Sequence, residues 1–543
     1  MAAAQRTISV SEFFAKNRHL LGFDNPRKAL LTTVKEAVDN SLDACEEAGI
    51  LPVVQVDIEQ VGETHFRVTV ADNGPGIVRK QVPNIFGKLL YGSKFHRLRM
   101  SRGQQGIGIS AAGMYGVLTT GVPVKITSRT GPRQQAHHYE LQIDTKNNRP
   151  QIIRDEPAEW EAPHGTKVTI ELEARFQRGR QSVDDYLAQT AIANPHVTLI
   201  YRAPDGQVSE YKGTVDALPP PTKEIRPHPY GIELGVLLKM LNDTRARTTQ
   251  QFLTREFSRV SPRVAGEILT KAGVEPRSRP SRLGNEAGRR IYQAIQETKI
   301  MAPATDCVAP IGEDKLLSGL RQVVDAAFYV GTSRSPAVYR GNPFLIEAAV
   351  AYGAPEAAEK PPDAAAQAQG EAAAGIAPAE ADEDDSARGG DGEQIARLIR
   401  FANRVPLLYQ QSACAAYRSV AGLNWRQYGL TQGRGALPSG PLTVVVHMAS
   451  VWVPFTSESK EAVASYPEIL REMRLALQEC GRKLATHIRK TVRHKQELKK
   501  RSYIEKYIPA IGEALRDILD LKDRQVTAVC SSLRDVLERT RRF

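Results

Sequence analysis

Three side chains on one predicted helix have the types and spacing of a site that acts on water. At about 100° per residue, Glu36, Asn40 and Asp43 fall within roughly 60° of one another on one face. The opposite face is an apolar stripe, made by Leu30, Leu31, Val34, Val38, Leu42 and Cys45. A carboxylate can polarise a water molecule while a nearby amide oxygen ligates Mg²⁺. A plain amphipathic helix would show the same pattern, so the chemistry needs further elements.

A strand that ends in an acid is the second candidate element. Residues 66–72 alternate in polarity, which predicts a strand, and the run stops at the string Asp72-Asn-Gly-Pro-Gly76. An acid at a strand end can accept a hydrogen bond from an exocyclic amine and so select adenine. Gly74 and Gly76 would let the backbone approach a flat ring closely. The alternative is an ordinary turn built on Asp-Asn-Gly.

A glycine-rich loop is the third candidate element. In the string Ser101-Arg-Gly-Gln-Gln-Gly-Ile-Gly-Ile-Ser110, Gly103, Gly106 and Gly108 would free backbone N–H groups to hold phosphates. The apolar run that follows can begin a helix whose N-terminus favours anions. Many flexible loops share this spacing. The absence of a following Gly-Lys-Ser/Thr excludes a P-loop, and the absence of a strand running into the loop excludes the Rossmann fingerprint.

In this order and spacing, the three elements resemble the Bergerat-fold ATPases, the family of gyrase, the heat-shock ninety chaperones, histidine kinases and mismatch-repair MutL. The string His164-Gly-Thr166, before a predicted strand at 167–172, resembles the last motif of that family. The resemblance implies that Glu36 is the general base for water attack on the γ-phosphate and that Asn40 holds Mg²⁺. It also implies that Asp72 reads the adenine amine with support from Thr166, and that the glycine loop is the ATP lid.

Longer strings resemble one branch of the family, the B subunits of the type IIB enzyme DNA topoisomerase VI, over nearly the whole chain. These strings are Thr33-Val-Lys-Glu-Ala-Val-Asp-Asn-Ser-Leu-Asp-Ala44, Gly87-Lys-Leu-Leu-Tyr-Gly-Ser-Lys-Phe95, Arg102-Gly-Gln-Gln-Gly-Ile-Gly108, Arg400-Phe-Ala-Asn-Arg-Val-Pro-Leu-Leu-Tyr409, Asn424-Trp-Arg-Gln-Tyr-Gly429 and Trp452-Val-Pro-Phe-Thr-Ser-Glu-Ser-Lys460. The resemblance implies that Lys460 reaches from a second domain to the γ-phosphate. Without it, Lys460 would be taken for a surface lysine in a turn.

The same resemblance implies a set of nucleotide contacts, with ATP and Mg²⁺ as the expected cofactors. Glu36 and Lys460 would be catalytic, and Asn40 would also bind the metal. Some family members have a lysine at the position of Ser110. Here the side chain has no charge and can donate only one hydrogen bond, from its hydroxyl, to a phosphate. The expected ATP-binding residues are Asn40, Asp72, Gly74, Gly76, Ser93, Lys94, Gly103, Gln104, Gln105, Gly106, Ile107, Gly108, Ile109, Ser110, Thr166 and Lys460.

The elements that must position these residues predict an α+β multidomain protein. The resemblance implies a strap at residues 1–20 that swaps onto a second copy, and a Bergerat ATPase α/β sandwich at 21–227. A helix-two-turn-helix domain at 228–306 and an α/β transducer domain at 307–470 would follow. A C-terminal region at 471–543, with a long helix, would contact the A subunit. The sequence itself predicts that 228–303 is all-helical, because it has no strand pattern.

The charge balance predicts a polyanionic partner. The 543 residues include 73 Lys and Arg against 61 Asp and Glu, a net charge of +12. Residues 354–393 hold 11 acidic and 2 basic side chains, a net charge of −9, so the rest of the chain carries +21. Such a body is expected to bind double-stranded DNA through its phosphates, with little sequence preference. The basic run at 482–506, taken alone, suits a solvated helix face.

The segment 354–393 has a composition unlike that of the rest of the chain. It is rich in Ala, Pro, Gly and acids and has no aromatic residue, which predicts disorder. Apolar runs at 343–352 and 395–408 flank it, so it either interrupts one domain or links two. Its Asp382-Glu-Asp384 string resembles a metal motif, but no packed frame is expected to hold the carboxylates.

Composition also excludes several classes of protein. With 41% hydrophobic and 25% charged residues, usage is that of a soluble globular protein. No apolar run approaches the ~18 residues of a membrane span, and no membrane partner is expected. Residues 1–16 lack the pattern of a signal peptide. Five widely spaced cysteines exclude a C-x-x-C zinc site and argue against disulfides, so an intracellular location is expected, cytoplasmic in a prokaryote or nuclear in a eukaryote.

The resemblance implies an ATP-hydrolysing subunit of an A2B2 topoisomerase. ATP-driven dimerisation of the ATPase domain would gate the passage of one duplex through a break made by the A subunit, relaxing supercoils and decatenating DNA. The folded parts of the sequence offer no nucleophilic tyrosine and no toprim-like acidic pair, so this chain is not expected to cut DNA. One rival is a MutL-like mismatch-repair clamp, where no helical insert is expected. Another is a non-catalytic scaffold relative, against which the intact Glu36 and Asn40 argue.

Overall fold

The computed structural model describes residues 8–92, 97–103, 106–353, 394–457 and 459–540. The described chain forms two units. One is Met1–Leu423 with Gly433–Cys480, and the other is Asn424–Gln432 with Gly481–Phe543. All five cysteines are free thiols, as their spacing predicted. None of the described helices has the length and apolar character that crossing a bilayer requires.

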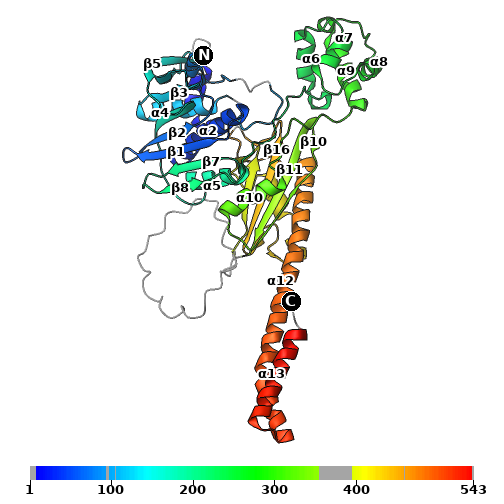
Figure 1. Cartoon of the computed structure of the whole chain (residues 1–543). Helices are drawn as coiled ribbons and strands as arrows, with labels where there is room; N and C mark the ends of the chain where they lie inside the picture. The colour runs from blue at the N-terminus through cyan, green and yellow to red at the C-terminus, as the bar shows by residue number, and fades with distance from the viewer. Residues whose placement is uncertain (1–7, 93–96, 104–105, 354–393, 458, 541–543) are drawn as a thin grey trace. The chain divides into compact units, whose positions relative to one another are not determined.

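The N-terminal part of the first unit is built on an eight-stranded sheet (Figure 1). Its strands are β1 Val53–Gln60, β2 His65–Asp72, β3 Val124–Arg129, β4 Ala136–Asp144, β5 Arg149–Ala158, β6 Gly165–Glu173, β7 Thr198–Arg202 and β8 Val208–Tyr211. The order across the sheet is β5-β4-β3-β6-β2-β1-β7-β8, and all neighbours are antiparallel except β1 and β7. The predicted strands at 66–72 and 167–172 are confirmed as β2 and β6, which pair directly and place Asp72 opposite Thr166.

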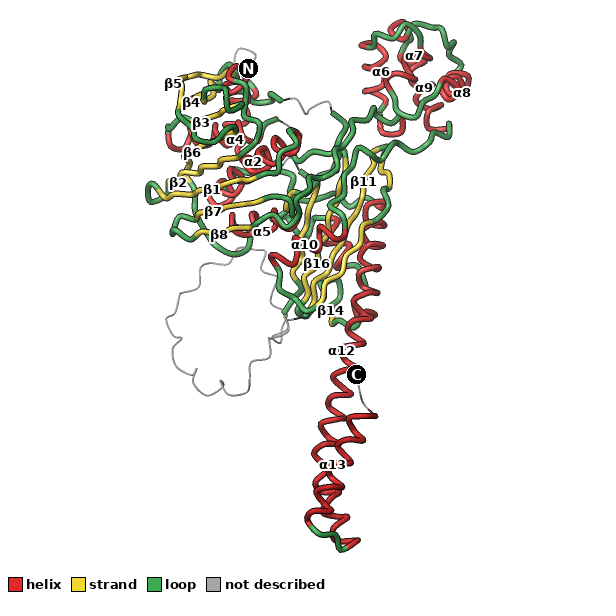
Figure 2. The backbone as a smooth tube through the Cα atoms, viewed as in Figure 1, coloured by secondary structure: helices red, strands yellow, loops and turns green. Residues whose placement is uncertain are grey.

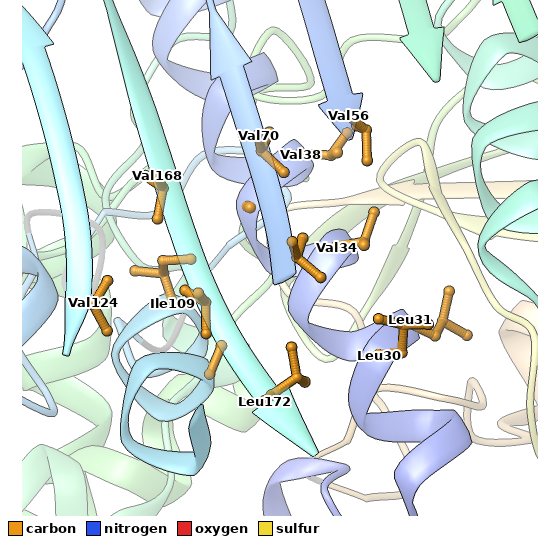
Figure 3. Close-up of a cluster of buried hydrophobic side chains, with 14 of the residues drawn as sticks. Leu30, Leu31, Val34, Val38, Val56, Val70, Ile109, Val124, Val168 and Leu172 are labelled. Atoms are coloured by element: carbon orange, nitrogen blue, oxygen red, sulfur yellow. The ribbon is translucent and has the colours of Figure 1, made fainter. Parts of the chain in front are cut away.

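Helices pack on this sheet through apolar side chains. They are α1 Val10–Lys16, α2 Pro26–Glu47, α3 Val82–Gly87, α4 Gly108–Thr120 and α5 Val183–Ala193. Asn25 caps α2 by accepting a hydrogen bond from the Lys28 N–H at 2.8 Å, and Pro26 occupies its first turn. Figure 3 shows side chains of α2 and α4 meeting those of the strands in one core. The predicted apolar stripe of α2 is confirmed as buried, and this burial turns Glu36 and Asn40 away from the core.

A helical body follows the sandwich, as the sequence predicted for 228–303. Its helices are α6 Leu234–Asp243, α7 Thr249–Glu256, α8 Pro262–Ala272 and α9 Asn285–Glu297. They enclose a core of their own, in which Phe252, Ile268 and Ile291 are completely buried. Ser261 caps α8 by accepting a hydrogen bond from the Val264 N–H, and Gly273 ends it in the left-handed conformation.

A second sheet completes the first unit. It contains β9 Phe328–Ser333, β10 Ala337–Tyr339, β11 Asn342–Tyr352, β12 Arg397–Ala402, β13 Val405–Pro406 and β16 Leu442–Ser450, with α10 Glu313–Val323, α11 Ala415–Ala421 and β15 Pro438–Ser439 nearby in sequence. Strands β11 and β12 both pair with β16. The segment 354–393 therefore joins two strands of one sheet and is an insertion within a domain. The segment itself, including Asp382-Glu-Asp384, lies outside the described residues.

The second unit consists mainly of helix. Its elements are most of α12 Pro467–Leu519, then α13 Asp523–Thr540, and the short strand β14 Thr431–Gln432. The sequence predicted one long helix, and the structure adds a second that folds back beside the first (Figure 2). Within this pair the Cys530 Sγ lies 3.7 Å from the Ile508 carbonyl oxygen. A side chain at Gly512 would meet Cys530, which explains a glycine in the middle of the helix.

Candidate functional site

A cavity of about 670 Å³ gathers most of the residues that the sequence singled out. Its size is that of a pocket for a small organic ligand. The predicted residues among its lining are Glu36, Asn40, Asp72, Gly76, Gly103, Gly106, Ile107, Gly108, Ile109, Ser110, Thr166 and Lys460. Gly74 is not among the lining residues, but its backbone N–H donates a hydrogen bond to the Asp72 Oδ1. The expected contacts Ser93, Lys94, Gln104 and Gln105 lie outside the described residues.

Glu36 and Asn40 lie one turn apart on α2 and both face this cavity. Glu36 is half-buried and Asn40 is exposed. The carboxylate of Glu36 lies against the first residue of α4, so closely that a Cβ on Gly108 would overlap its Oε2. The Asn40 Oδ1 lies 3.9 Å from the position that a Cβ of Gly103 would take. The acid therefore meets the helix N-terminus, and the amide meets the beginning of the glycine loop.

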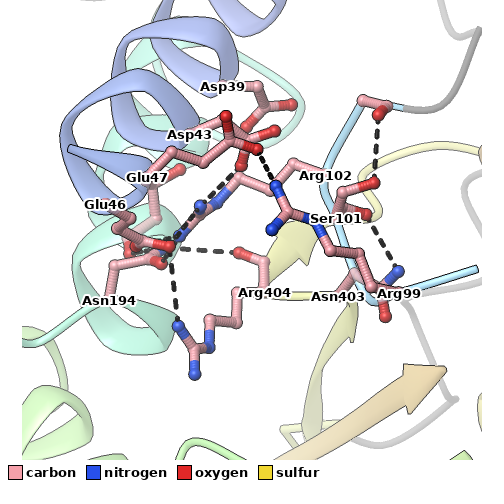
Figure 4. A network of polar contacts seen from close by, with 12 residues as sticks. Asp39, Asp43, Glu46, Glu47, Arg99, Ser101, Arg102, Asn194, Asn403 and Arg404 are labelled. Carbon is pink, nitrogen blue, oxygen red and sulfur yellow. Dashed lines mark hydrogen bonds and ion pairs between the residues drawn. The ribbon is translucent and has the colours of Figure 1, made fainter. Parts of the chain in front are cut away.

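Asp43, the third polar residue of the predicted face, does not join them. It is buried, and its Oδ1 accepts a hydrogen bond from the Arg102 guanidinium at 2.9 Å. The sequence predicted that Asp43 shares a helix face with Glu36 and Asn40, but it could not show that Arg102 lies over the end of α2 and pairs with Asp43. Figure 4 shows Arg102 between Asp43 and Glu46.

Asp72 is held in one orientation at the end of β2. Its Oδ1 accepts hydrogen bonds from the backbone N–H groups of Gly74 at 2.9 Å and Thr166 at 3.1 Å, and its Oδ2 accepts one from the Ser41 hydroxyl at 2.8 Å. Burial raises the pKa of Asp72, while these hydrogen bonds oppose the shift. A carboxylate has about four acceptor positions, so three bonds leave room for a further donor such as an amine.

The turn after Asp72 is fixed by residues of β3 and β6 and by His164, which directly precedes β6. The His164 Nδ1 lies 2.8 Å from the Gly74 carbonyl oxygen. Gly76 has φ +70°, and a Cβ there would overlap the Arg129 carbonyl oxygen, so only glycine fits. Thr166 supports Asp72 through its backbone, while its hydroxyl lies 3.2 Å from the Ser128 Oγ. Sequence reasoning missed Ser41, which lies directly after Asn40 on α2.

The Ser110 hydroxyl is bonded within the protein. Its hydroxyl donates a hydrogen bond to the Ile85 carbonyl at 2.7 Å, and its side chain is buried. This bond connects α4 to α3. A phosphate contact of Ser110 stays a prediction, and its backbone N–H in the first turn of α4 is a further possible donor.

Lys460 reaches the cavity from the loop after β16. The loop closes through a hydrogen bond from the Thr456 N–H to the Ala462 carbonyl at 2.9 Å, and Lys460 itself has φ +56°. Burial lowers the pKa of the Lys460 ammonium, and the carboxylates of Glu36, Asp39 and Asp43 oppose that shift. The next residue, Glu461, contacts the Lys28 Nζ of α2 at 2.6 Å. No pattern in the sequence predicted that Lys28 and Glu461 would form this ion pair.

Comparison with known proteins identifies the class to which the fold and the cavity belong. Residues 25–176 match the family of histidine kinase-, DNA gyrase B- and HSP90-like ATPases. Residues 303–500 match the transducer of topoisomerase VI B subunits. The chain is therefore an ATPase of the gyrase B and HSP90 class, joined to a transducer domain.

Curated relatives identify the particular family. The B subunit of type 2 DNA topoisomerase 6 from Methanococcoides burtonii is 46% identical over 96% of this chain and 78% of the relative. Its counterpart from Archaeoglobus fulgidus is 43% identical over 98% of this chain and 83% of the relative. The chain belongs to the topoisomerase VI B-subunit family, and it is the ATP-hydrolysing subunit of a type II DNA topoisomerase. This membership sets aside the MutL-like clamp and the non-catalytic scaffold.

Proposed function

We propose that Glu36, Asn40 and Asp72 are the central residues of the ATP site, with the loop from Gly103 to Gly108 as its lid. The single observation that carries this proposal is the position of the Glu36 carboxylate. It lies against the N-terminus of α4 and in the same cavity as Asn40 and Lys460. Asp72, fixed by three hydrogen bonds, would accept the adenine amine at the other end of the cavity.

In the proposed reaction Glu36 accepts a proton from water while the water oxygen bonds to the γ-phosphorus. The bond from that phosphorus to the β–γ bridging oxygen breaks, and ADP and phosphate result. Positioning and charge provide most of the catalysis in such phosphoryl transfers. The Lys460 ammonium, a compact charge, would contact a γ-phosphate oxygen. This contact differs between ATP and ADP, so it would report hydrolysis to the transducer.

The Asn40 amide is the proposed protein ligand of Mg²⁺. Its side chain is exposed to the cavity beside Gly103, where a phosphate chain would pass. Among the described residues no group of three His, Cys, Asp or Glu could hold a metal ion. This fits Mg²⁺, which usually binds through one or two protein oxygens together with substrate phosphates and water. When bound, the ion would neutralise charge on the triphosphate.

At the scale of the complex, we propose that two copies dimerise through their ATPase domains when ATP binds. With a partner A subunit that cuts DNA, they would form an A2B2 enzyme that passes one duplex through another. In the described part of the strap, the Ser11 hydroxyl donates a hydrogen bond to the Thr145 carbonyl of its own chain at 2.8 Å. Proposed domain limits remain 1–20, 21–227, 228–306, 307–470 and 471–543, with the last contacting the A subunit.

Substitution of Glu36 tests the catalytic proposal. For Glu36→Ala and the isosteric Glu36→Gln, we expect ATP binding to persist and the hydrolysis rate to fall about 10²–10⁴-fold, the range for loss of a general base. Glu59→Gln, at an exposed position near the end of β1, is the matched control and should keep the wild-type rate. A wild-type rate in both Glu36 variants would remove Glu36 as the base.

Supercoil relaxation tests the proposed division of labour. We expect relaxation only when this chain is combined with an A-type subunit and ATP, and the Glu36→Gln variant should lose it. Strand passage by this chain alone would contradict the proposal that the partner makes the break.

A further inference from the structure

The turn between β12 and β13 has an unusual backbone. Asn403 and Arg404 are consecutive residues with φ +49° and +67°, in the left-handed region that favours glycine. The Asn403 N–H donates to the Met448 carbonyl at 2.8 Å, and the Leu407 N–H donates to the Arg400 carbonyl at 2.8 Å. Both side chains are buried. Such a conformation persists only where the surrounding structure fixes it. The hydrogen-bond partners of the two side chains show which parts of the protein do so.

The Asn403 amide joins the transducer sheet to the root of the glycine loop, by which we mean Ser101 and Arg102, the two residues directly before Gly103. Its Oδ1 accepts a hydrogen bond from the Ser450 N–H of β16 at 2.8 Å. Its Nδ2 donates a hydrogen bond to the Ser101 carbonyl at 3.0 Å. Ser101 lies two residues before Gly103, where the loop meets Asn40. One side chain therefore bonds both to the central strand of the transducer and to the segment from which the loop begins. Figure 4 shows Asn403 beside Ser101.

Arg404 is anchored in the transducer core. Its backbone N–H donates to the His447 Nε2 at 3.1 Å, so the proton of His447 is on Nδ1, which donates to Glu347 at 2.9 Å. The His447 and Glu347 side chains are completely buried. The Arg404 Nη2 also donates to the Pro310 carbonyl at 3.2 Å.

The guanidinium of Arg404 meets the same acid that holds the loop root. Its Nη1 lies 3.9 Å from the Glu46 Oε2, and the Glu46 Oε1 lies 2.7 Å from the Arg102 Nη2. Arg102 is the residue between Ser101 and Gly103, and its side chain is 4% exposed. The transducer turn thus reaches the loop root twice, directly through Asn403 and indirectly through Arg404 and Glu46.

We propose that the Asn403–Arg404 turn is a positioning element that sets the root of the ATP lid, as a second link between transducer and nucleotide beside Lys460. The proposal rests on the lid function proposed above for Gly103 to Gly108. Ser101 and Arg102, which directly precede the loop, are held by the transducer side chains Asn403 and Arg404 and by Glu46 of α2, so a change in the position of these two residues would alter both sets of contacts. A root bonded to β16 couples such a change to the transducer sheet, and the coupling acts equally in both directions.

The isosteric substitution Asn403→Asp tests this link. A carboxylate keeps an acceptor for the Ser450 N–H and tolerates the left-handed conformation, but it faces the Ser101 carbonyl with an oxygen in place of a donor. In the full-length chain we expect the dissociation rate of a non-hydrolysable ATP analogue and the KM for ATP each to rise about tenfold, the effect of one broken buried hydrogen bond. The value of kcat should change far less than KM, which a merely structural defect would not produce.

Two further variants make the outcome decisive. Asn285→Asp, exposed at the start of α9, makes the same change of charge far from the loop and should match wild type. Asn403→Gly keeps the left-handed turn and loses both side-chain bonds, so it should raise KM as well and can replace Asn403→Asp if that variant does not fold. Wild-type KM and analogue dissociation in a folded Asn403 variant would overturn the proposal.

The lid function has its own control. Gly106 has φ +55°, so Gly106→Ala strains the loop itself and should weaken ATP binding. If Gly106→Ala weakens binding while the Asn403 variants behave as wild type, only the transducer link fails. If Gly106→Ala has no effect on binding either, the proposed lid fails first.

Discussion

At the scale of single residues, the position of the Glu36 carboxylate, the candidate base, depends on a glycine. Gly108 begins α4, and its missing Cβ is the space that the Glu36 carboxylate occupies. Gly76 has the same function at the other end of the cavity, where the backbone of β3 passes. Close approach of the Glu36 carboxylate explains Gly108 better than loop flexibility does, because Gly108 lies in a helix. Gly76 is needed both for its positive φ and for the space that the β3 backbone takes.

Gly108→Ala should therefore damage hydrolysis without unfolding the protein. The new methyl group would displace the Glu36 carboxylate from the N-terminus of α4, and we expect the hydrolysis rate to fall at least about tenfold. Gly266→Ala, inside α8 with open space around it, is the matched control. It should raise the free energy of unfolding by about 1 kcal/mol and leave the ATPase rate unchanged. An active Gly108→Ala variant would show that the carboxylate position is not critical.

His196 makes the stability of the N-terminal domain depend on pH. Burial lowers the pKa of His196 below its usual 6.5, although Glu46, 2.8 Å away, opposes this. Near pH 6.5 the imidazole of His196 therefore binds a proton in the unfolded chain but not in the folded chain. The free energy of unfolding falls as the pH drops below 6.5. Arg102 and His196 hold the pKa of Glu46 well below its usual 4.5, which adds a second loss below pH 4.5.

Urea unfolding at pH 7.5 and pH 5.5 measures this effect. The wild-type midpoint should fall more than that of His196→Gln, in which the titrating group is absent. His65→Gln, exposed at the start of β2, should behave as wild type. An equal fall in wild type and His196→Gln would assign the pH dependence elsewhere.

At the scale of elements, α2 connects the two ends of the site with the transducer. Its first turns carry Lys28, which binds Glu461, its middle carries Glu36 and Asn40, and its last turn carries Glu46. The loop that holds Lys460 is thus fixed to the same helix that holds the candidate base. The Lys28 and Glu461 side chains are 13% and 8% exposed, so the pair is shielded from solvent.

Lys28→Met should leave the Glu461 carboxylate buried without its cation. We expect a loss of about 3 kcal/mol in the free energy of unfolding and a lower ATP turnover, since Lys460 is adjacent. The double variant Lys28→Met/Glu461→Met removes both charges and should recover much of the stability but not the turnover. Lys223→Met breaks an exposed pair with Asp306 and should change stability by less than about 1 kcal/mol. A double variant with full turnover would disprove the positioning of Lys460 by this pair.

At the scale of the whole molecule, charge outside 354–393 determines the expected partner. The remaining net charge of +21 favours binding to a phosphate backbone. We expect affinity for double-stranded DNA to fall about 10³-fold or more between 50 and 200 mM salt, the loss for roughly six or more phosphate contacts. Fluorescence anisotropy with two duplexes of unrelated sequence measures this, and both should give the same slope. A strong preference for one duplex would contradict contacts with phosphates alone.

The sequence by itself determined the ATPase helix, the β2 strand with its terminal acid, the helical body and the C-terminal helix. These features are local, because the spacing of apolar residues and the glycine positions record them within a few turns of chain. The resemblance in long strings added Lys460, whose place in the cavity no local pattern could indicate. It also named Ser110, but only the structure showed its hydroxyl bonded to the Ile85 carbonyl.

Only the tertiary structure decided how distant segments meet. It showed that Asp43 forms a buried ion pair with Arg102. It also showed two hydrogen bonds, from the Ser41 hydroxyl to the Asp72 carboxylate and from the Asn403 amide to the Ser101 carbonyl. It also showed that 354–393 interrupts one sheet, because β11 and β12 share β16. Side-chain periodicity reveals which face of an element is buried, but not which partner covers it, since partners come from any point along the chain. The contacts on which the proposed link between transducer and loop rests also join distant segments of the chain.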